Sequence, residues 1–252
     1  MAKPPAPPGK SPPGKSPIGK TPPGKSPAGS PAGTTRQLAD RLRTAKGRTI
    51  GSQRWLERQL NDPYVKEAKA RGLRSRAAFK LEQMDDKFHL LKPGSRVVDL
   101  GAAPGGWTQV SLARGAGRVV GIDLLVVDPI PGAILMQGDF QDAEAERRVL
   151  EALDGQADLV LSDMAPNTTG HNATDHLRIM ALAEIALDFA GRVLAPGGGF
   201  VTKVLAGGSE KEFLATLKRD FAVVRHAKPP ASRKDSAELY VVATGFRGGK
   251  PA

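Results

Sequence analysis

The stretch Asp99-Leu-Gly-Ala-Ala-Pro-Gly-Gly-Trp107 decides the fold of this chain. It follows an apolar pair, Val97 and Val98, that is typical of a buried strand, and it ends at Trp107, where we expect a helix to begin. Between them, the small residues from Gly101 to Gly106 allow backbone N–H groups to approach a ligand without interference from a Cβ atom. A strand that leads through such a turn into a helix is typical of domains that bind nucleotide-sized ligands.

An aspartate at the end of a second predicted strand helps to identify the class of ligand. Arg118-Val-Val-Gly-Ile-Asp123 predicts another buried strand, and Asp123 lies 22 residues beyond Gly101. A carboxylate at an offset of about 20 residues commonly contacts a ribose diol. A dinucleotide site needs Gly where the turn has Ala103, with Pro104 beside it, which argues against NAD or FAD. S-adenosylmethionine carries no phosphate, and the sequence therefore favours it as the cofactor.

A third acidic residue fits the same ligand. Ala133-Ile-Leu-Met-Gln-Gly-Asp139 predicts a third strand, with Asp139 just past its end, where the carboxylate would accept a hydrogen bond from the adenine amino group. Asp139 could equally be the N-cap of a helix predicted over residues 141–153, and one side chain could serve both roles.

Strands and helices alternate along the rest of the chain. We expect further strands over residues 157–163, 199–203, 221–225 and 238–243, and further helices over 174–194 and 210–218. This pattern predicts an α/β fold with a doubly wound, mainly parallel seven-stranded sheet and helices on both faces. Ligands bind at the carboxyl ends of such strands, where Asp99, Asp123, Asp163 and Lys203 fall. We therefore treat these four residues as functional candidates.

The charge of the chain is concentrated at its N-terminal end. Residues 1–80 contain 18 basic and 4 acidic side chains, a net charge of +14, whereas residues 81–252 carry a net charge of −3. A polyanion is the natural partner of such a segment, and nucleic acid is favoured because no apolar helix face accompanies the charge.

The location of the protein follows from two absences in the sequence. The absence of cysteine excludes disulfides and thiolate chemistry. No apolar run is long enough to span a membrane or form a signal peptide, so we expect a cytoplasmic protein.

The composition divides the chain into three parts. Residues 1–35 repeat Pro-Pro-Gly-Lys-Ser with a five-residue period and cannot bury a core, which predicts a disordered basic tail. Residues 36–74 form an Arg-rich arm that contains Trp55 and Tyr64, a composition that suits RNA, although a solvated helix face would look similar. Residues 75–252 form the catalytic domain, and Ser75 is the expected cap of its first helix.

The chain resembles the FtsJ-type ribosomal RNA large subunit methyltransferases over about residues 50–246. The resemblance rests on five motifs: Ser75-Arg-Ala-Ala-Phe-Lys80, the Asp99–Trp107 stretch, Leu161-Ser-Asp-Met-Ala-Pro-Asn167, Thr202-Lys203 and Ser236-Ala-Glu-Leu-Tyr240. It implies a Rossmann-like methyltransferase fold that uses S-adenosylmethionine to methylate the ribose 2′-hydroxyl of a uridine in 23S rRNA, as a monomer acting on the large subunit. The Pro-Gly-Lys-Ser repeats go beyond the family pattern, and the role of the tail stays open.

The resemblance also implies which residues form the site. The residues that match the family's catalytic set are Lys80, Asp163, Lys203 and Glu238. The residues that match its cofactor site, together with the remaining turn glycines, are Gly101, Gly105, Gly106, Trp107, Asp123, Asp139 and Asp163. No metal is required.

The chemistry explains why such a set is needed. A ribose hydroxyl is a very weak acid, so catalysis must align its oxygen and remove its proton. Lys203 beside Lys80 could act as a neutral base, or as a cation that stabilises the developing alkoxide. Asp163 would orient Lys203, and Glu238 would hold the lysines in place.

Three alternatives remain at this point. An NAD-dependent oxidoreductase would need Gly in place of Ala103. A non-catalytic RNA-binding protein on a relic fold would be expected to lack part of the catalytic set. A methyltransferase of tRNA anticodon loops would share the core and the catalytic set.

Overall fold

The computed structural model of the protein describes residues 50–166, 169–206, 210–233 and 236–248. The chain divides into two compact units, Met1–Ala39 and Asp40–Ala252, and every described residue belongs to the second. The predicted tail at residues 1–35 and the first part of the predicted arm, residues 36–49, lie outside the described residues.

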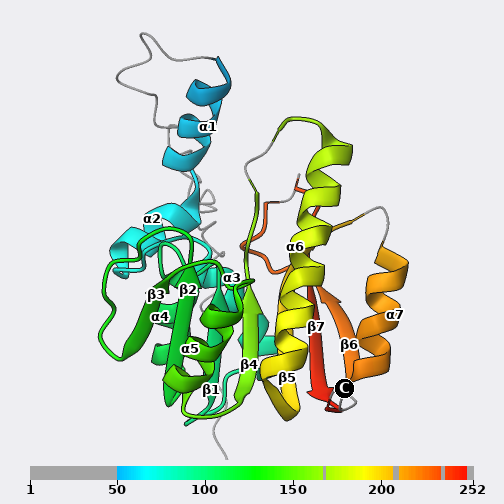
Figure 1. Ribbon diagram of the computed structural model, residues 1–252. Helices are drawn as coiled ribbons and strands as arrows, with labels where there is room; N and C mark the ends of the chain where they lie inside the picture. Colours follow the sequence, from blue (N-terminus) through cyan, green and yellow to red (C-terminus); the bar gives the residue numbers. More distant parts are fainter. Residues whose placement is uncertain (1–49, 167–168, 207–209, 234–235, 249–252) are drawn as a thin grey trace, which may run out of the picture. The chain divides into compact units, whose positions relative to one another are not determined.

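A single sheet forms the centre of the second unit. Its seven strands in the described part of the chain have the order β3-β2-β1-β4-β5-β7-β6 (Figure 1). The pairing is parallel from β3 through to β5, and β7 is antiparallel to both of its neighbours. The strands are β1 (Arg96–Leu100), β2 (Arg118–Asp123), β3 (Ala133–Gln137), β4 (Ala157–Ser162), β5 (Leu194–Leu205), β6 (Phe221–Ala227) and β7 (Glu238–Phe246). The prediction of a mainly parallel seven-stranded sheet is confirmed.

Helices cover both faces of this sheet. They are α1 (Ile50–Leu60), α2 (Pro63–Ala70), α3 (Ala78–Phe88), α4 (Gly106–Ala113), α5 (Ala143–Leu153), α6 (Asn172–Val193) and α7 (Glu210–Asp220). Successive side chains of a strand point to opposite faces, so Val98 packs in a cluster with residues of α5 and α6, whereas Val97 packs with residues of α3 and α4. Figure 1 shows α5 and α6 in front of the strands. The predicted helices on both faces are therefore confirmed.

Several predicted boundaries differ from the structure by a few residues, and two of the differences have clear local reasons. Ser75 does not cap α3: the N-cap is Ala77, without a side-chain hydrogen bond. The Ser75 Oγ is buried and turned toward α4, where a Cβ on Gly106 would lie only 2.4 Å from it. Strand β5 begins at Leu194 rather than at residue 199, because Leu194 pairs with Ala157 before a register shift restores regular pairing at Gly199.

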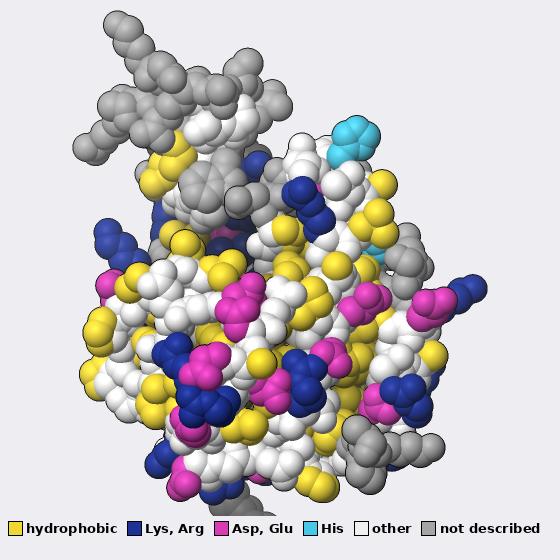
Figure 2. Space-filling view, in the orientation of Figure 1, with side chains coloured by type: hydrophobic (Ala, Val, Ile, Leu, Met, Phe, Trp, Pro, Cys, Tyr) yellow, Lys and Arg dark blue, Asp and Glu magenta, His cyan; other side chains and the backbone are white. Residues whose placement is uncertain are grey.

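The front of the sheet carries paired charges rather than a basic surface. Acidic and basic side chains are interspersed there (Figure 2). On α5 and α6, Arg147 pairs with Glu144, and Arg192 pairs with Glu146 across the two helices. This balance agrees with the small net charge that the sequence assigns to residues 81–252. None of the helices in the described part of the chain has the length and apolarity needed to cross a membrane.

Candidate active site

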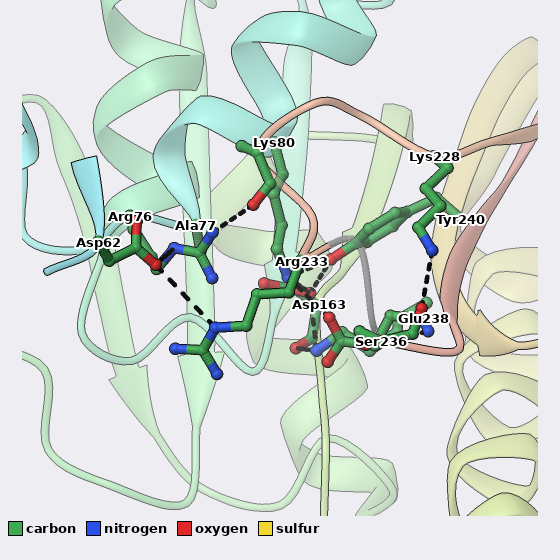
Figure 3. Close-up of polar contacts among 12 residues, drawn as sticks. Asp62, Arg76, Ala77, Lys80, Asp163, Lys228, Arg233, Ser236, Glu238 and Tyr240 are labelled. Atoms are coloured by element: carbon green, nitrogen blue, oxygen red, sulfur yellow. Dashed lines mark hydrogen bonds and ion pairs between the residues drawn. The ribbon is translucent and has the colours of Figure 1, made fainter. Parts of the chain in front are cut away.

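Four ionisable side chains from three strands and a helix meet at one place. Lys203 of β5 has its Nζ 2.8 Å from Oδ1 of Asp163, which directly follows β4. The Lys80 Nζ, from α3, lies 3.7 Å from the same carboxylate oxygen and 3.5 Å from Oε2 of Glu238, the first residue of β7 (Figure 3). The structure therefore brings together all four residues that the family resemblance selects as catalytic.

Tyr240 joins this cluster, although the sequence analysis gave it no role. Its hydroxyl accepts a hydrogen bond from the Lys80 Nζ at 2.8 Å and donates one to Oδ1 of Asp163 at 2.5 Å (Figure 3). Tyr240 lies two residues beyond Glu238 on β7 and pairs with Lys203 of β5. Its i+2 spacing from Glu238 on a strand is the signal that could have identified it, because such residues share a face.

Burial sets the electrostatics of the cluster. Burial alone would raise the pKa of Asp163, but the ammonium groups of Lys203 and Lys80 and the hydrogen bonds from Lys203 and Tyr240 outweigh it, and the pKa lies below its usual value. Burial and the neighbouring Asp163 carboxylate raise the pKa of Tyr240 well above that of an ordinary tyrosine. Asp163 is therefore ionised at neutral pH and Tyr240 remains a proton donor.

Trp107 positions the helix that carries Lys80. Its indole Nε1 donates a hydrogen bond to the backbone carbonyl of Ala77 at 2.8 Å, next to the first residue of α3. Its ring packs against that of Tyr240, with centroids 5.8 Å apart. Trp107 is itself buried, so it links the start of α3 to Tyr240 from within the core.

A cavity of about 490 Å³ lies beside the cluster, at the carboxyl ends of β1, β2 and β4. Four of the predicted cofactor residues line it, namely Gly101, Asp123, Asp139 and Asp163, together with apolar side chains of Ile122, Leu124, Leu125, Phe140, Met164 and Leu182. The other three predicted residues, Gly105, Gly106 and Trp107, are not among its lining residues. Asp163 therefore belongs both to the cluster of ionisable side chains and to the cavity wall.

The other two carboxylates that line the cavity, those of Asp123 and Asp139, also accept hydrogen bonds from backbone N–H groups. Asp123 accepts hydrogen bonds from the backbone N–H of Ala103 at 2.9 Å and of Leu125 at 2.8 Å. Asp139 accepts one from Gln141 at 3.0 Å, but the N-cap of α5 is Asp142, so Asp139 is not a helix cap. Each carboxylate oxygen has two lone pairs, and both side chains can still accept hydrogen bonds from a ligand in the cavity.

The glycines of the turn are needed for close packing within the protein. A Cβ on Gly101 would lie 2.4 Å from Cγ of Met164, and one on Gly105 would lie 2.6 Å from Cδ1 of Ile130. Both glycines also have positive φ angles, of 72° and 109°, which other residues rarely adopt. These glycines therefore also make room for neighbouring segments, and Gly101 lines the cavity as well.

Asp99 lies beneath the turn and away from the cavity wall. It is 1% exposed and accepts a hydrogen bond from the Thr108 hydroxyl at 2.7 Å. Burial raises its pKa to about 7, although the hydrogen bond from Thr108 opposes the shift. Asp99 thus supports the turn and does not contact the space that a cofactor would fill.

Part of the basic segment before α3 is used inside the molecule. Arg71 pairs with Glu82, and Arg76 pairs with the buried Asp62 at 3.0 Å (Figure 3). Tyr64 packs its ring against Phe79, with centroids 5.3 Å apart, instead of presenting it for base stacking. Fewer positive charges of this segment are therefore available for contacts with RNA phosphates than its composition indicates.

Known proteins with similar sequences and structures include the following. The family model described as FtsJ-like methyltransferase matches residues 73–246. The ribosomal RNA large subunit methyltransferase E of Acidiphilium cryptum is 66% identical over 215 residues, which cover 85% of this chain and 96% of that protein. The protein of the same name from Granulibacter bethesdensis is 66% identical over 206 residues, covering 82% and 90%. A solved structure from Plasmodium falciparum, designated a ribosomal RNA methyltransferase, is 30% identical with a TM-score of 0.63 and covers 70% of this chain and 100% of that one.

Proposed function

Because the chain belongs to the FtsJ-like methyltransferase family, we propose that it methylates the ribose 2′-hydroxyl of a uridine in 23S rRNA. The observation that carries this proposal is the position of Asp163, which takes part in the Lys80–Lys203–Glu238 cluster and also lines the adjacent cavity. A methyl donor in the cavity and an acceptor hydroxyl at the cluster would therefore meet at one carboxylate.

S-adenosylmethionine is the proposed methyl donor, and the cavity suits it. Asp123 and Asp139 are placed to accept hydrogen bonds from ribose hydroxyls and an adenine amino group, and the apolar side chains around them suit the flat face of a base. When bound, this cofactor supplies an electrophilic methyl group on a sulfonium. The Asp163 carboxylate then provides a negative charge near that positive centre.

The cluster acts on the acceptor hydroxyl. Lys203 touches the hydroxyl and either takes its proton or, as an ammonium, stabilises the alkoxide as it develops. Asp163 holds Lys203 in place through two contacts, at 2.8 Å to a carboxylate oxygen and at 2.9 Å to the backbone carbonyl. Lys80 adds a second positive charge at this point, and Glu238 and Tyr240 fix its position.

The proposed substrate is 23S rRNA, in the context of the large ribosomal subunit, and the proposed location of the reaction is the cytoplasm. The basic residues of the N-terminal 80 residues would supply most of the phosphate contacts. The cluster and the cavity are built from residues of one chain, so we propose that the monomer is active. The similar proteins named above act on ribosomal RNA according to their names, which favours rRNA over a tRNA anticodon loop.

Mapping of 2′-O-methylation tests this proposal. Total RNA is compared from cells that lack the gene, cells complemented with the normal gene, and cells complemented with Lys203→Ala. We expect one 23S rRNA uridine to lose its methyl group in the first and third strains and to regain it in the second. Loss of a methyl group from a tRNA, with 23S rRNA unchanged, would overturn the proposal.

A further inference from the structure

The guanidinium of Arg74 donates hydrogen bonds to three backbone carbonyls. Its Nη1 donates to the carbonyl of Asp128 at 2.7 Å and to that of Pro104 at 3.1 Å, and its Nη2 donates to the carbonyl of Pro129 at 2.8 Å. Hydrogen bonds from a charged donor are about twice as strong as those between neutral groups. The planar fork of arginine is also suited to contact several acceptors at once.

The three carbonyls belong to two segments that each contribute residues to the cavity lining. Pro104 lies in the Gly-rich turn next to Ala103, a lining residue. Asp128 and Pro129 lie in the loop between β2 and β3, whose first residues, Leu124 and Leu125, also line the cavity. The side chain of Arg74 thus ties the turn to this loop.

Arg74 is itself held in place by the helix that follows the turn. Its backbone N–H donates to Oε1 of Gln109 on α4 at 2.8 Å, and Nε2 of Gln109 donates to the carbonyl of Gly72. A Cβ on Gly105 would lie 3.1 Å from Nη1 of Arg74, so the turn packs directly on the side chain. The backbone of Arg74 is therefore held by Gln109, and its side chain is held by packing against the turn.

The start of the loop that Arg74 restrains is held by hydrogen bonds rather than by packing: the Leu125 N–H donates to Asp123, and Nε2 of Gln137 donates to the carbonyl of Leu124. Leu124 and Leu125 are each 66% exposed and Val126 is 74% exposed, so this part of the wall is not anchored in the core. The conformation of such an exposed segment depends on its hydrogen bonds rather than on buried apolar contacts.

We propose that Arg74 is a positioning residue for the cofactor: it holds the turn and the β2–β3 loop in the arrangement that forms the binding cavity, and so sets the affinity for S-adenosylmethionine. This inference rests on the proposed function, because it assumes that the cavity takes this cofactor. It assigns Arg74 to the cofactor site, whereas its place in the Arg-rich segment alone suggests an RNA contact. Without Arg74 the two walls separate more readily, and part of the binding energy is used to restore them.

Calorimetric titration of S-adenosylhomocysteine into the full-length protein tests the proposal. We expect Arg74→Ala to raise its dissociation constant at least about tenfold, and Arg74→Lys to raise it less, since one ammonium can replace only part of the fork. The matched control is Arg71→Ala, which removes the same charge from the same segment but from a residue that pairs with Glu82. In steady-state kinetics the KM for S-adenosylmethionine should rise in Arg74→Ala while kcat at saturating cofactor stays within about threefold.

Hydrogen exchange gives a second measurement that does not depend on activity. Amides of residues 124–130 should exchange faster in Arg74→Ala than in the Arg71→Ala control. If Arg74→Ala does not fold, Arg74→Lys carries both measurements.

Unchanged affinity in Arg74→Ala, or an equal loss in Arg71→Ala, would overturn the assignment of Arg74. Failure of the unmodified protein to bind S-adenosylhomocysteine would instead overturn the proposed cofactor. The two failures are therefore distinguishable.

Discussion

Lys203 contacts Asp163 twice: its Nζ lies 2.8 Å from the carboxylate Oδ1 and donates a hydrogen bond to the backbone carbonyl of the same residue at 2.9 Å. The two contacts fix the ammonium at the end of β5, at the place where β4 ends. An ammonium has three hydrogens, so these two contacts alone do not use the whole donor capacity of Lys203, as the proposed contact with a substrate hydroxyl requires.

Replacement of Lys203 should abolish methyl transfer and spare cofactor binding, because the side chain acts on the hydroxyl. We expect Lys203→Ala to reduce kcat far more than tenfold, which corresponds to a barrier increase well above about 1.4 kcal/mol. Single-turnover assays at saturating cofactor, with calorimetry as the control for binding, provide the measurement. More than a tenth of the normal rate in Lys203→Ala would remove Lys203 from the catalytic role.

Lys203→Arg separates the two roles that the lysine could have. Arginine stays protonated in proteins and cannot serve as a base, but it can still stabilise an alkoxide. Activity clearly above that of Lys203→Ala would therefore favour charge stabilisation, and equal inactivity would favour proton removal.

Tyr240→Phe should reduce kcat by about tenfold without a change in cofactor affinity, because it removes the hydrogen bond that joins Lys80 to Asp163. The hydrogen bond from Tyr240 helps to lower the pKa of Asp163, so its loss raises that pKa. The acidic limb of the kcat profile should therefore move to higher pH. A profile that drops in height with no shift would mean that the hydroxyl acts by holding Lys80 in place and not through the pKa of Asp163.

Asp123→Ala should chiefly raise the KM for S-adenosylmethionine. The change removes a proposed ribose acceptor and also releases the backbone amides of Ala103 and Leu125, two residues that line the cavity. Asp123→Asn is the informative control, since its carbonyl oxygen can retain one of these acceptor roles. An unchanged KM in Asp123→Ala would show that the carboxylate has only a structural role.

Asp99 should make stability fall as the pH rises. Its pKa is raised to about 7, so the folded state binds the proton more tightly than the unfolded state, and this stabilisation is lost as the pH rises through about 7. Relative to Asp99→Asn, the normal protein should lose about 2 kcal/mol of unfolding free energy between about pH 5 and pH 8. Urea titrations of both proteins at several pH values measure this difference. A difference that does not vary with pH would show that Asp99 is ionised throughout this range.

Much of the fold followed from local sequence patterns. The apolar runs ending in Asp99, Asp123 and Ser162–Asp163 predicted parallel strands, and these strands are present. Of their carboxylates, Asp123 and Asp163 line the cavity, whereas Asp99 is buried beneath the turn. The strand prediction was correct because residue alternation and turn chemistry act over a few residues. Boundaries were less accurate where distant segments decide them, as with Leu194, which extends β5 by pairing with Ala157.

The contacts that position the site could not be read from spacing alone. Tyr240 reaches Lys80 across 160 residues of sequence, and Arg74 reaches the carbonyls of Asp128 and Pro129 across more than 50. Such contacts depend on how segments pack in three dimensions. For the same reason, the spacing of the turn glycines did not predict that Gly105 packs against Arg74 and Ile130.

The last prediction concerns how RNA affinity is divided along the chain. Residues 1–80 carry a net charge of +14 and residues 81–252 a net charge of −3, so phosphate contacts should come mainly from the N-terminal part and make binding dependent on salt. Deletion of residues 1–34 removes five lysines from a repeat whose composition predicts a large ordering cost on binding, and we expect a modest loss of RNA affinity with full activity at saturating RNA.

Deletion through Arg58 removes most of α1 and its arginines. It should raise the KM for RNA far more and flatten the salt dependence, while S-adenosylmethionine binding persists because Arg74 and the cavity remain. RNA titrations of both truncations at several salt concentrations measure the difference, and equal damage from the two deletions would mean that the repeats bind RNA directly.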